Sequence, residues 1–164
     1  MKRLWIIVAA FLLTGCASQK DYEVMADDYI VPEQEAKQVN VSIPKEDAAW
    51  VMPVADTGEM YFCDGYTVLV ETFDAGDLDK TLKQVSGFSR DELQVVERTD
   101  DNLHRLECVW AAAGEGQDQI GRAVILDDGA YHYVLTFMAD APKAGQLMPQ
   151  WEQIADSFSL DTAQ

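Results

Sequence analysis

The sequence predicts an α+β fold, in which helices pack on one side of an antiparallel β-sheet within a single domain. Three observations lead to this prediction. Stretches with a two-residue hydrophobic period lie between turn signals, two stretches have a helical period instead, and no repeat is visible along the chain. The 164 residues suffice for one domain of ordinary size with its own hydrophobic core.

The first strands are expected after a polar N-terminal stretch. Residues 39–43 (VNVSI) alternate apolar and polar side chains and are followed by Pro44. Residues 60–62 and 66–73 are rich in β-branched and aromatic side chains, and the Cys-Asp-Gly sequence between them is typical of a hairpin turn. These segments predict a strand followed by a hairpin.

The hydrophobic period then becomes helical. Leu78, Leu82 and Val85 lie on one face of a predicted short helix, which Gly87 ends. Residues 89–93 (SRDEL) contain a capping box, in which the serine and the glutamate satisfy each other's backbone amides. A second helical turn is therefore expected there.

Three longer strands are expected next, at residues 103–112, 119–126 and 130–138. The last two are joined by Asp-Asp-Gly, which is typical of a tight hairpin. A C-terminal helix should then pack on the sheet through an apolar stripe. The stripe consists of Leu147, Trp151, Ile154 and Phe158.

The N-terminus has the layout of an export signal. Lys2 and Arg3 precede ten apolar residues (LWIIVAAFLL), which as a helix reach about 15 Å, roughly half the thickness of the hydrocarbon core. Residues 13–16 (LTGC) resemble the lipobox of bacterial lipoproteins, in which the cysteine is lipidated and the chain is cleaved before it. Gly15 and Cys16 would then flank the cleavage site. A plain signal peptide or a buried N-terminal helix is the alternative.

The lipobox implies three segments: a signal peptide at 1–15, the lipidated cysteine and an acidic tether at 16–37, and a globular domain at 38–164. Cys16 would be the lipidation site and the first residue of the mature chain. The membrane would be a partner through this lipid alone, at the cell membrane or the outer membrane, with the domain facing the periplasm or the exterior.

The net charge bears on the possible partners, and the cysteine content bears on a possible disulfide. A net charge of −17 argues against nucleic acid as a partner, because no basic stripe is present to contact phosphates. With Cys16 lipidated, Cys63 and Cys108 remain as an even pair in a compartment where disulfides persist. We expect them to form a disulfide, and two buried thiols are the alternative.

No motif indicates catalysis. The chain lacks the spacing of zinc ligands around His104 and His132, and it has no nucleophile elbow or phosphate-binding loop. None of the 29 Asp and Glu residues stands out as a catalytic pair. We therefore expect no metal, no cofactor and no enzyme activity, but a binding or accessory module with an envelope protein as a possible partner. The alternatives are a carboxylate-dependent envelope hydrolase and a coat protein that binds a small ligand.

Two expectations concern single side chains. His132 lies between Tyr131 and Tyr133, so it should face solvent if the tyrosines face the C-terminal helix. Most aromatic residues should be buried, and any tryptophan that proves exposed would mark a partner surface.

The order of elements resembles the PsbP/DcrB-like fold, a group that includes extrinsic photosystem proteins and small bacterial lipoproteins. The resemblance covers about residues 38 to 161. It implies an accessory, non-catalytic role and assigns no functional residues. The two internal cysteines and the high acidity depart from it. The stretches that carry it are VNVSIP, Trp50, DDGAYHYVLTF and WEQIADSFSL.

Overall fold

A computed structural model describes the part of the chain that follows the predicted signal peptide and most of the tether. The described residues are 35–44, 48–55, 58–100, 103–113 and 117–161. Every element below belongs to the unit Glu35–Gln164. Gly15 and Cys16 lie outside the described residues. No helix in the described part is long and apolar enough to cross a membrane.

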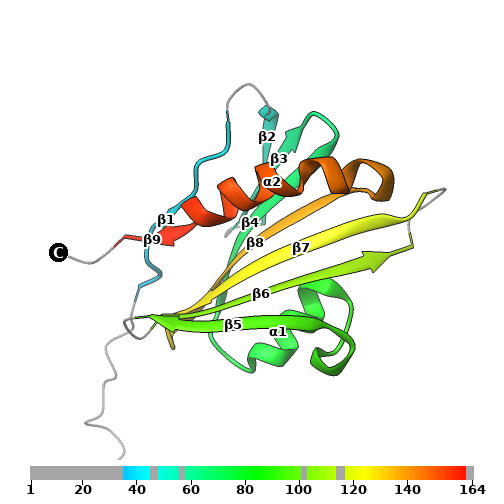
Figure 1. The fold of residues 1–164 in the computed structure, drawn as a ribbon. Helices are drawn as coiled ribbons and strands as arrows, with labels where there is room; N and C mark the ends of the chain where they lie inside the picture. Colours follow the sequence, from blue (N-terminus) through cyan, green and yellow to red (C-terminus); the bar gives the residue numbers. More distant parts are fainter. Residues whose placement is uncertain (1–34, 45–47, 56–57, 101–102, 114–116, 162–164) are drawn as a thin grey trace, which may run out of the picture. The chain divides into compact units, whose positions relative to one another are not determined.

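Seven strands form one sheet in the order β2-β3-β4-β8-β7-β6-β5, and every neighbouring pair is antiparallel (Figure 1). A separate two-stranded ladder joins β1 (Val39–Asn40) to β9 (Ser159–Leu160). The strands of the large sheet are β2 (Ala48–Val54), β3 (Gly58–Cys63), β4 (Tyr66–Asp74), β5 (Gln94–Asp100), β6 (Leu103–Ala112), β7 (Gln119–Asp127) and β8 (Tyr131–Asp140).

Two helices cover parts of this sheet (Figure 1). The long helix α2 (Ala141–Ser157) packs on one face, where Trp151 stacks on Phe137 of β8 with ring centroids 5.3 Å apart. The short helix α1 (Leu78–Ser86) places Leu82 in a second cluster together with Val134, whose side chain points to the other face of β8. The α+β class and the antiparallel sheet are confirmed.

The side on which each helix lies follows from the connections. The long C-terminal helix covers one side of the sheet, as predicted. The segment with α1 connects β4, third in the sheet, to β5 at the far edge, and it passes along the opposite face (Figure 1). The sheet therefore has two buried clusters, one on its α2 side and one on its α1 side.

The predicted signals around α1 are present. Asp77 caps its N-terminus by accepting a hydrogen bond from a backbone N–H of the first turn. Gly87 ends it with a φ of 82°, a left-handed conformation that glycine adopts at low cost, and its N–H donates to the Lys83 carbonyl. The capping box is also present, but it begins a single 3₁₀ turn, η1 (Arg90–Glu92), and Leu93 is already extended.

The β7–β8 hairpin holds the start of the described chain. The Asp128 carboxylate accepts N–H bonds from its own turn and forms an ion pair with Lys37 at 2.9 Å. Burial raises the pKa of Asp128, but the Lys37 ammonium and the backbone N–H groups outweigh it and lower the pKa. The backbone N–H of Lys37 also donates to the Tyr133 hydroxyl. Lys37, which the sequence places at the end of the tether, is thus fixed to the domain.

Two edge strands and one short ladder were not predicted. β2 and β5 form the two edges of the sheet, and β5 (QVVERTD) has exposed side chains at all but one position. An edge strand with little burial lacks the alternation that identifies inner strands. Residues 39–43 pack their alternate apolar side chains on the α2-side cluster as expected, although β1 itself has only two residues.

No disulfide joins Cys63 and Cys108. Cys63 lies on β3 and packs on the α2-side cluster, whereas Cys108 lies on β6 in the α1-side cluster. Three strands separate β3 from β6. At about 4.8 Å between strands the two positions are roughly 19 Å apart, and a disulfide needs Cα atoms within about 7 Å. The predicted disulfide is therefore wrong.

Candidate binding surface

One half of the α1 side of the sheet carries apolar side chains that belong to neither buried cluster. They come from three neighbouring strands and lie beside one another in the ladder, Trp50 next to Phe62 and Met60 between Met52 and Leu69. We call this surface the β2–β4 strip. It consists of Trp50, Met52, Met60, Phe62 and Leu69.

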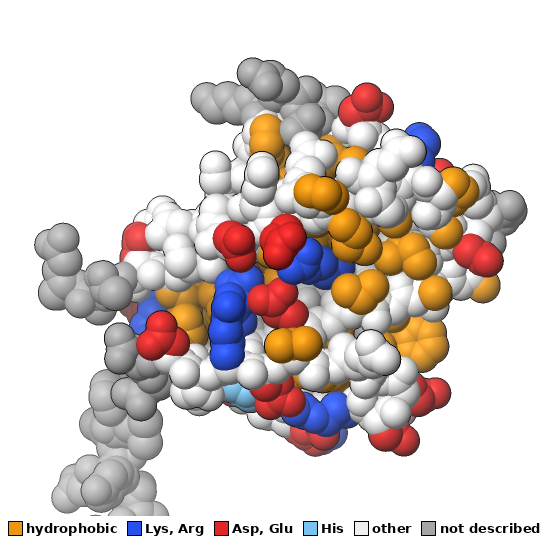
Figure 2. Space-filling model, viewed as in Figure 1, with side chains coloured by type: hydrophobic (Ala, Val, Ile, Leu, Met, Phe, Trp, Pro, Cys, Tyr) orange, Lys and Arg blue, Asp and Glu red, His pale blue; other side chains and the backbone are white. Residues whose placement is uncertain are grey.

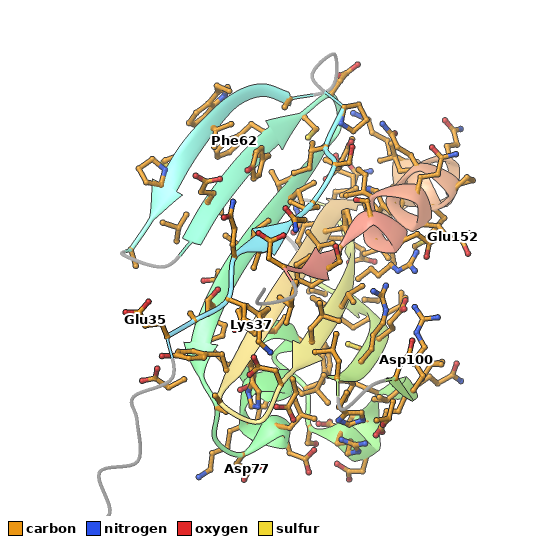
Figure 3. All side chains as sticks on the ribbon, turned by 90° about the vertical axis from the view of Figure 1, so that its left-hand side faces the viewer. Glu35, Lys37, Phe62, Asp77, Asp100 and Glu152 are labelled. Carbon is orange, nitrogen blue, oxygen red and sulfur yellow. The ribbon has the colours of Figure 1, made fainter. Side chains whose placement is uncertain are left out.

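The ladder shows which side of the sheet the strip is on. Leu69 is paired with Thr136 of β8, two residues from Val134, which packs beside Leu82 of α1. Side chains two apart in a strand share a face. The strip and α1 therefore lie on the same side of the sheet but at different ends. Phe62 is at the opposite end of the structure from Asp77, which caps α1 (Figure 3).

One end of the strip is an aromatic pair, in which Trp50 is exposed and Phe62 is partly buried. The rings of Trp50 and Phe62 stack with centroids 3.8 Å apart and planes 6° apart. Trp50 is 52% exposed. Trp110 and Trp151 are instead buried in the two clusters. The exposed tryptophan that the sequence analysis looked for is thus, among the described residues, Trp50 on β2.

The segment that forms the strip has no positive charge. Residues 48–74 contain no Lys, Arg or His. Its acidic residues include Glu59, whose carboxylate accepts a hydrogen bond of 2.6 Å from the Tyr61 hydroxyl on the α2 side of the sheet. Burial, together with this hydrogen bond and the Glu59 charge, raises the pKa of Tyr61 to about 12. Ionic contacts at this end of the sheet must therefore come from elsewhere.

Glu71 is the acidic residue that shares the face of the strip. Its ladder partners are Gly58 on β3 and Val134 on β8. A Cβ atom at Gly58 would lie 3.1 Å from the Glu71 Cγ, so the stem of the glutamate fills the space that the glycine leaves. Burial raises the pKa of Glu71. No Lys, Arg or His of the described chain forms an ion pair with it.

The other end of the sheet carries the ionic network. Arg105 is buried and donates to the Ala155 carbonyl at 2.9 Å and to Glu107 at 2.8 Å. Arg122 donates to the second oxygen of Glu107 at 2.9 Å, and Arg98 lies 3.6 Å from Glu107. Figure 2 shows positive and negative side chains side by side over this region, with hydrophobic ones next to them.

This network stabilises the fold. Arg105 donates to the carbonyl groups of Ala155 and Phe158 at the C-terminal end of α2, where backbone carbonyls have few partners within a helix. Partial burial raises the pKa of Glu107, but the hydrogen bonds from Arg105 and Arg122 outweigh it and lower the pKa. An open groove lies beside the network, and its lining includes Val96, Val109 and Trp110. It is near the start of β5, where β6 continues beyond its last residue paired with β5. We assign Arg105 to the end of α2, and Arg98 and Arg122 to Glu107, rather than to a ligand.

The histidines do not form a site. His132 is buried, and its Nδ1 lies 2.8 Å from the Thr81 hydroxyl of α1. The expectation that it faces solvent is wrong, because α1 covers the side of the sheet opposite its tyrosine neighbours. His104 contacts Glu97 at 3.0 Å on the surface. Within the described residues no group of three or more His, Cys, Asp or Glu could hold a metal ion.

The cysteines that the sequence singled out lie apart. Cys63 and Cys108 are on opposite faces of the sheet, and burial raises the pKa of the Cys108 thiol to about 11.

The sequence did not predict that Trp50 pairs with Phe62 or that Glu71 shares the face of the strip. The lack of any Lys, Arg or His over residues 48–74 was the sequence signal that could have directed attention to this surface.

Comparisons with known proteins identify the fold but no family. No protein-family model and no curated protein matches the chain, so the PsbP/DcrB-like resemblance stays a prediction. A crystal structure from Bacteroides thetaiotaomicron VPI-5482 is similar with a TM-score of 0.53 and 9% identity, over 76% of this chain and 45% of that one. The chain thus spans less than half the length of that protein.

A second similar structure is LpqN of Mycobacterium tuberculosis, described as involved in cell envelope biogenesis. Its TM-score is 0.53 and its identity 14%, over 77% of this chain and 85% of LpqN. A Pseudomonas aeruginosa protein of unknown function, PA94, follows with a TM-score of 0.49 and 14% identity, over 80% of this chain and 89% of that one. At these identities the likeness concerns the fold alone.

Proposed function

We propose that this chain is a cell-envelope lipoprotein whose domain acts as a non-catalytic binding module. The exposed ring of Trp50, stacked on the partly buried Phe62, is the observation that carries the proposal. Exposed apolar surface that is contiguous marks interaction sites on soluble domains, and aromatic residues contribute most of the energy at such sites. The domain then binds an envelope protein through the β2–β4 strip.

The anchor part of the proposal comes from the sequence. The LTGC sequence at 13–16 follows two basic and ten apolar residues. Acyl chains on Cys16 would attach the domain to the cell membrane or the outer membrane, since each buried CH₂ contributes about 0.8 kcal/mol and two or three chains hold stably. The description of LpqN as an envelope-biogenesis protein agrees with this location.

The anchor is tested by labelling. Cells that express the full chain are grown with a clickable fatty acid, and the chain is examined for label and for its presence in the membrane fraction. We expect Cys16→Ser to lose the label and the membrane attachment, while Cys63→Ser keeps both. Label on Cys16→Ser, or an unlabelled wild type, would refute lipidation at Cys16.

The binding surface is tested in the same cells with a photo-crosslinking amino acid. One variant carries it at Met52 in the strip, and the control carries it at Glu152 on α2, which is exposed on the other side of the sheet. We expect a discrete crosslinked species from position 52 that position 152 does not give. Equal crosslinking from both positions, or none from position 52, would remove the strip as the binding surface.

A further inference from the structure

We propose that the β2–β4 strip binds an amphipathic helix of its partner that carries lysine or arginine beside its apolar face, with Glu71 as the counter-ion. This inference rests on the proposed binding function and names the chemistry of the partner at the same surface. Helices that lay an apolar face on a hydrophobic surface are a recurring mode of peptide recognition.

The dimensions of the surface fit one helix. The outer two of three adjacent strands are about 10 Å apart, and a helix with its side chains is about 10–12 Å wide. The same side of the sheet is already covered at its other end by α1, whose Leu82 is fully buried against β7 and β8. A partner helix over β2, β3 and β4 would continue that layer.

Charge complementarity determines which helix fits. Residues 48–74 provide carboxylates and no cation. Glu71 lies on the face of the strip, is partly buried, and has no ion-pair partner among the described residues. A partly buried carboxylate without a counter-ion is slightly destabilising, and a cation from the partner would offset that effect. An exposed tryptophan ring such as that of Trp50 also attracts lysine and arginine.

Two other occupants fit less well. An anionic membrane surface would be repelled by the acidic residues and by the net charge of −17. A symmetric contact between two copies would bring the same segment against itself, with two Glu71 carboxylates and no cation from residues 48–74 on either side. A cationic amphipathic helix avoids both conflicts.

The test uses the full chain in nanodiscs of neutral lipid and three labelled synthetic helical peptides. The peptides share one leucine face and differ only in the residues beside it, which are lysine, glutamine or glutamate. Fluorescence anisotropy gives the dissociation constants for the wild type, Glu71→Gln, Trp50→Ala and a surface control, Glu152→Gln on α2. Because all variants sit in the same nanodiscs, peptide binding to lipid cancels in the comparison.

We expect the lysine peptide to bind the wild type and Glu152→Gln alike, and to bind Glu71→Gln about 5- to 10-fold more weakly, as for a partly buried interfacial ion pair. The glutamine peptide should not distinguish Glu71→Gln from the wild type, and the glutamate peptide should bind weakest. Trp50→Ala should weaken every peptide, because it removes apolar contact area.

The outcomes separate the two proposals. If Trp50→Ala weakens binding while Glu71→Gln does not, or if the glutamate peptide binds as tightly as the lysine peptide, the cationic partner is refuted and the strip remains a binding surface. If neither substitution changes any dissociation constant, the strip itself is refuted. Crosslinked dimers of the chain from position 52 in the absence of peptide would also refute the helix partner.

Discussion

The two ends of the sheet differ in what their side chains do. At the β5–β7 end, Arg105, Glu107 and Arg122 connect two strands and the C-terminus of α2 by hydrogen bonds of 2.8 to 2.9 Å. At the β2–β4 end, five apolar side chains lie outside both buried clusters and Glu71 has no described cation beside it. The first end uses ionisable groups for stability, and the second is where we propose that a partner binds.

The two edge strands of the sheet, β5 and β2, also differ in whether their exposed side chains are charged or apolar. β5 exposes Glu97, Arg98 and Asp100, and charged side chains on an edge strand discourage pairing with other chains. β2 exposes Trp50, Val51 and Met52 in succession. β2 therefore presents apolar side chains where β5 presents charged ones, and this difference agrees with the partner surface that we propose on β2.

The sharpest test of this comparison replaces one tryptophan from each setting. Trp151→Ala removes a fully buried ring that stacks on Phe137, and it should lower the free energy of unfolding by about 4 kcal/mol. Trp50→Ala removes a half-exposed ring outside both clusters, and it should cost less than about 1 kcal/mol. Urea unfolding followed by circular dichroism measures both.

The comparison fails if the two substitutions cost the same. A loss of several kcal/mol in Trp50→Ala would mean that its stack with Phe62 belongs to the hydrophobic core, and the strip would then be a structural feature. A small loss in Trp151→Ala would instead question the packing of α2 on the sheet.

Glu107→Gln should have the next largest effect, about 2 kcal/mol at neutral pH, because it leaves the buried Arg105 without its carboxylate. The pKa of Glu107 is lowered in the folded state, so its stabilisation is present above the unfolded value of about 4.3 and is lost as pH falls through the folded pKa. Urea unfolding between pH 3 and 7 should therefore show the two proteins converging in acid. Parallel curves would contradict the assigned ion pairs.

Glu71→Gln should act in the opposite direction and more weakly. The pKa of Glu71 is raised by burial, so the folded state favours the protonated form and the wild type loses stability as pH rises above about 4.3. The substitution should stabilise the protein at pH 7 by about 0.5 kcal/mol or less, after allowance for solvent screening. The same pH series measures it, and destabilisation at pH 7 would reveal a cationic partner for Glu71 within the chain.

The inner elements could be predicted because burial imposes a pattern on them. β6 has the predicted bounds, β7 and β8 differ from theirs by one or two residues at an end, and α1 ends at Gly87 as predicted. β2 and β5 escaped prediction because edge strands bury little and alternate weakly. Local sequence patterns also do not indicate the face of the sheet on which α1 lies, because that face depends on the strand order.

The proposed binding surface was predictable only in part. An exposed tryptophan was expected to mark it, but Trp50 could be separated from Trp110 and Trp151 only by knowing the register that places it on an uncovered half of the sheet. The face on which Glu71 lies is known only from its ladder partners Gly58 and Val134, which are distant from it in the sequence. Three-dimensional pairing, and not residue type, makes these positions informative.

The cysteines illustrate the same limit and provide the last test, in which no effect is expected. Counting cysteines predicts a bridge, and closing the loop between Cys63 and Cys108 would contribute roughly 4 kcal/mol in the chain-entropy model. The structure places the two at opposite ends of the sheet and on opposite faces. Urea unfolding of the full chain should therefore give the same free energy with and without reductant. A loss of several kcal/mol on reduction would overturn the strand order between β3 and β6, and with it the separation of the two ends.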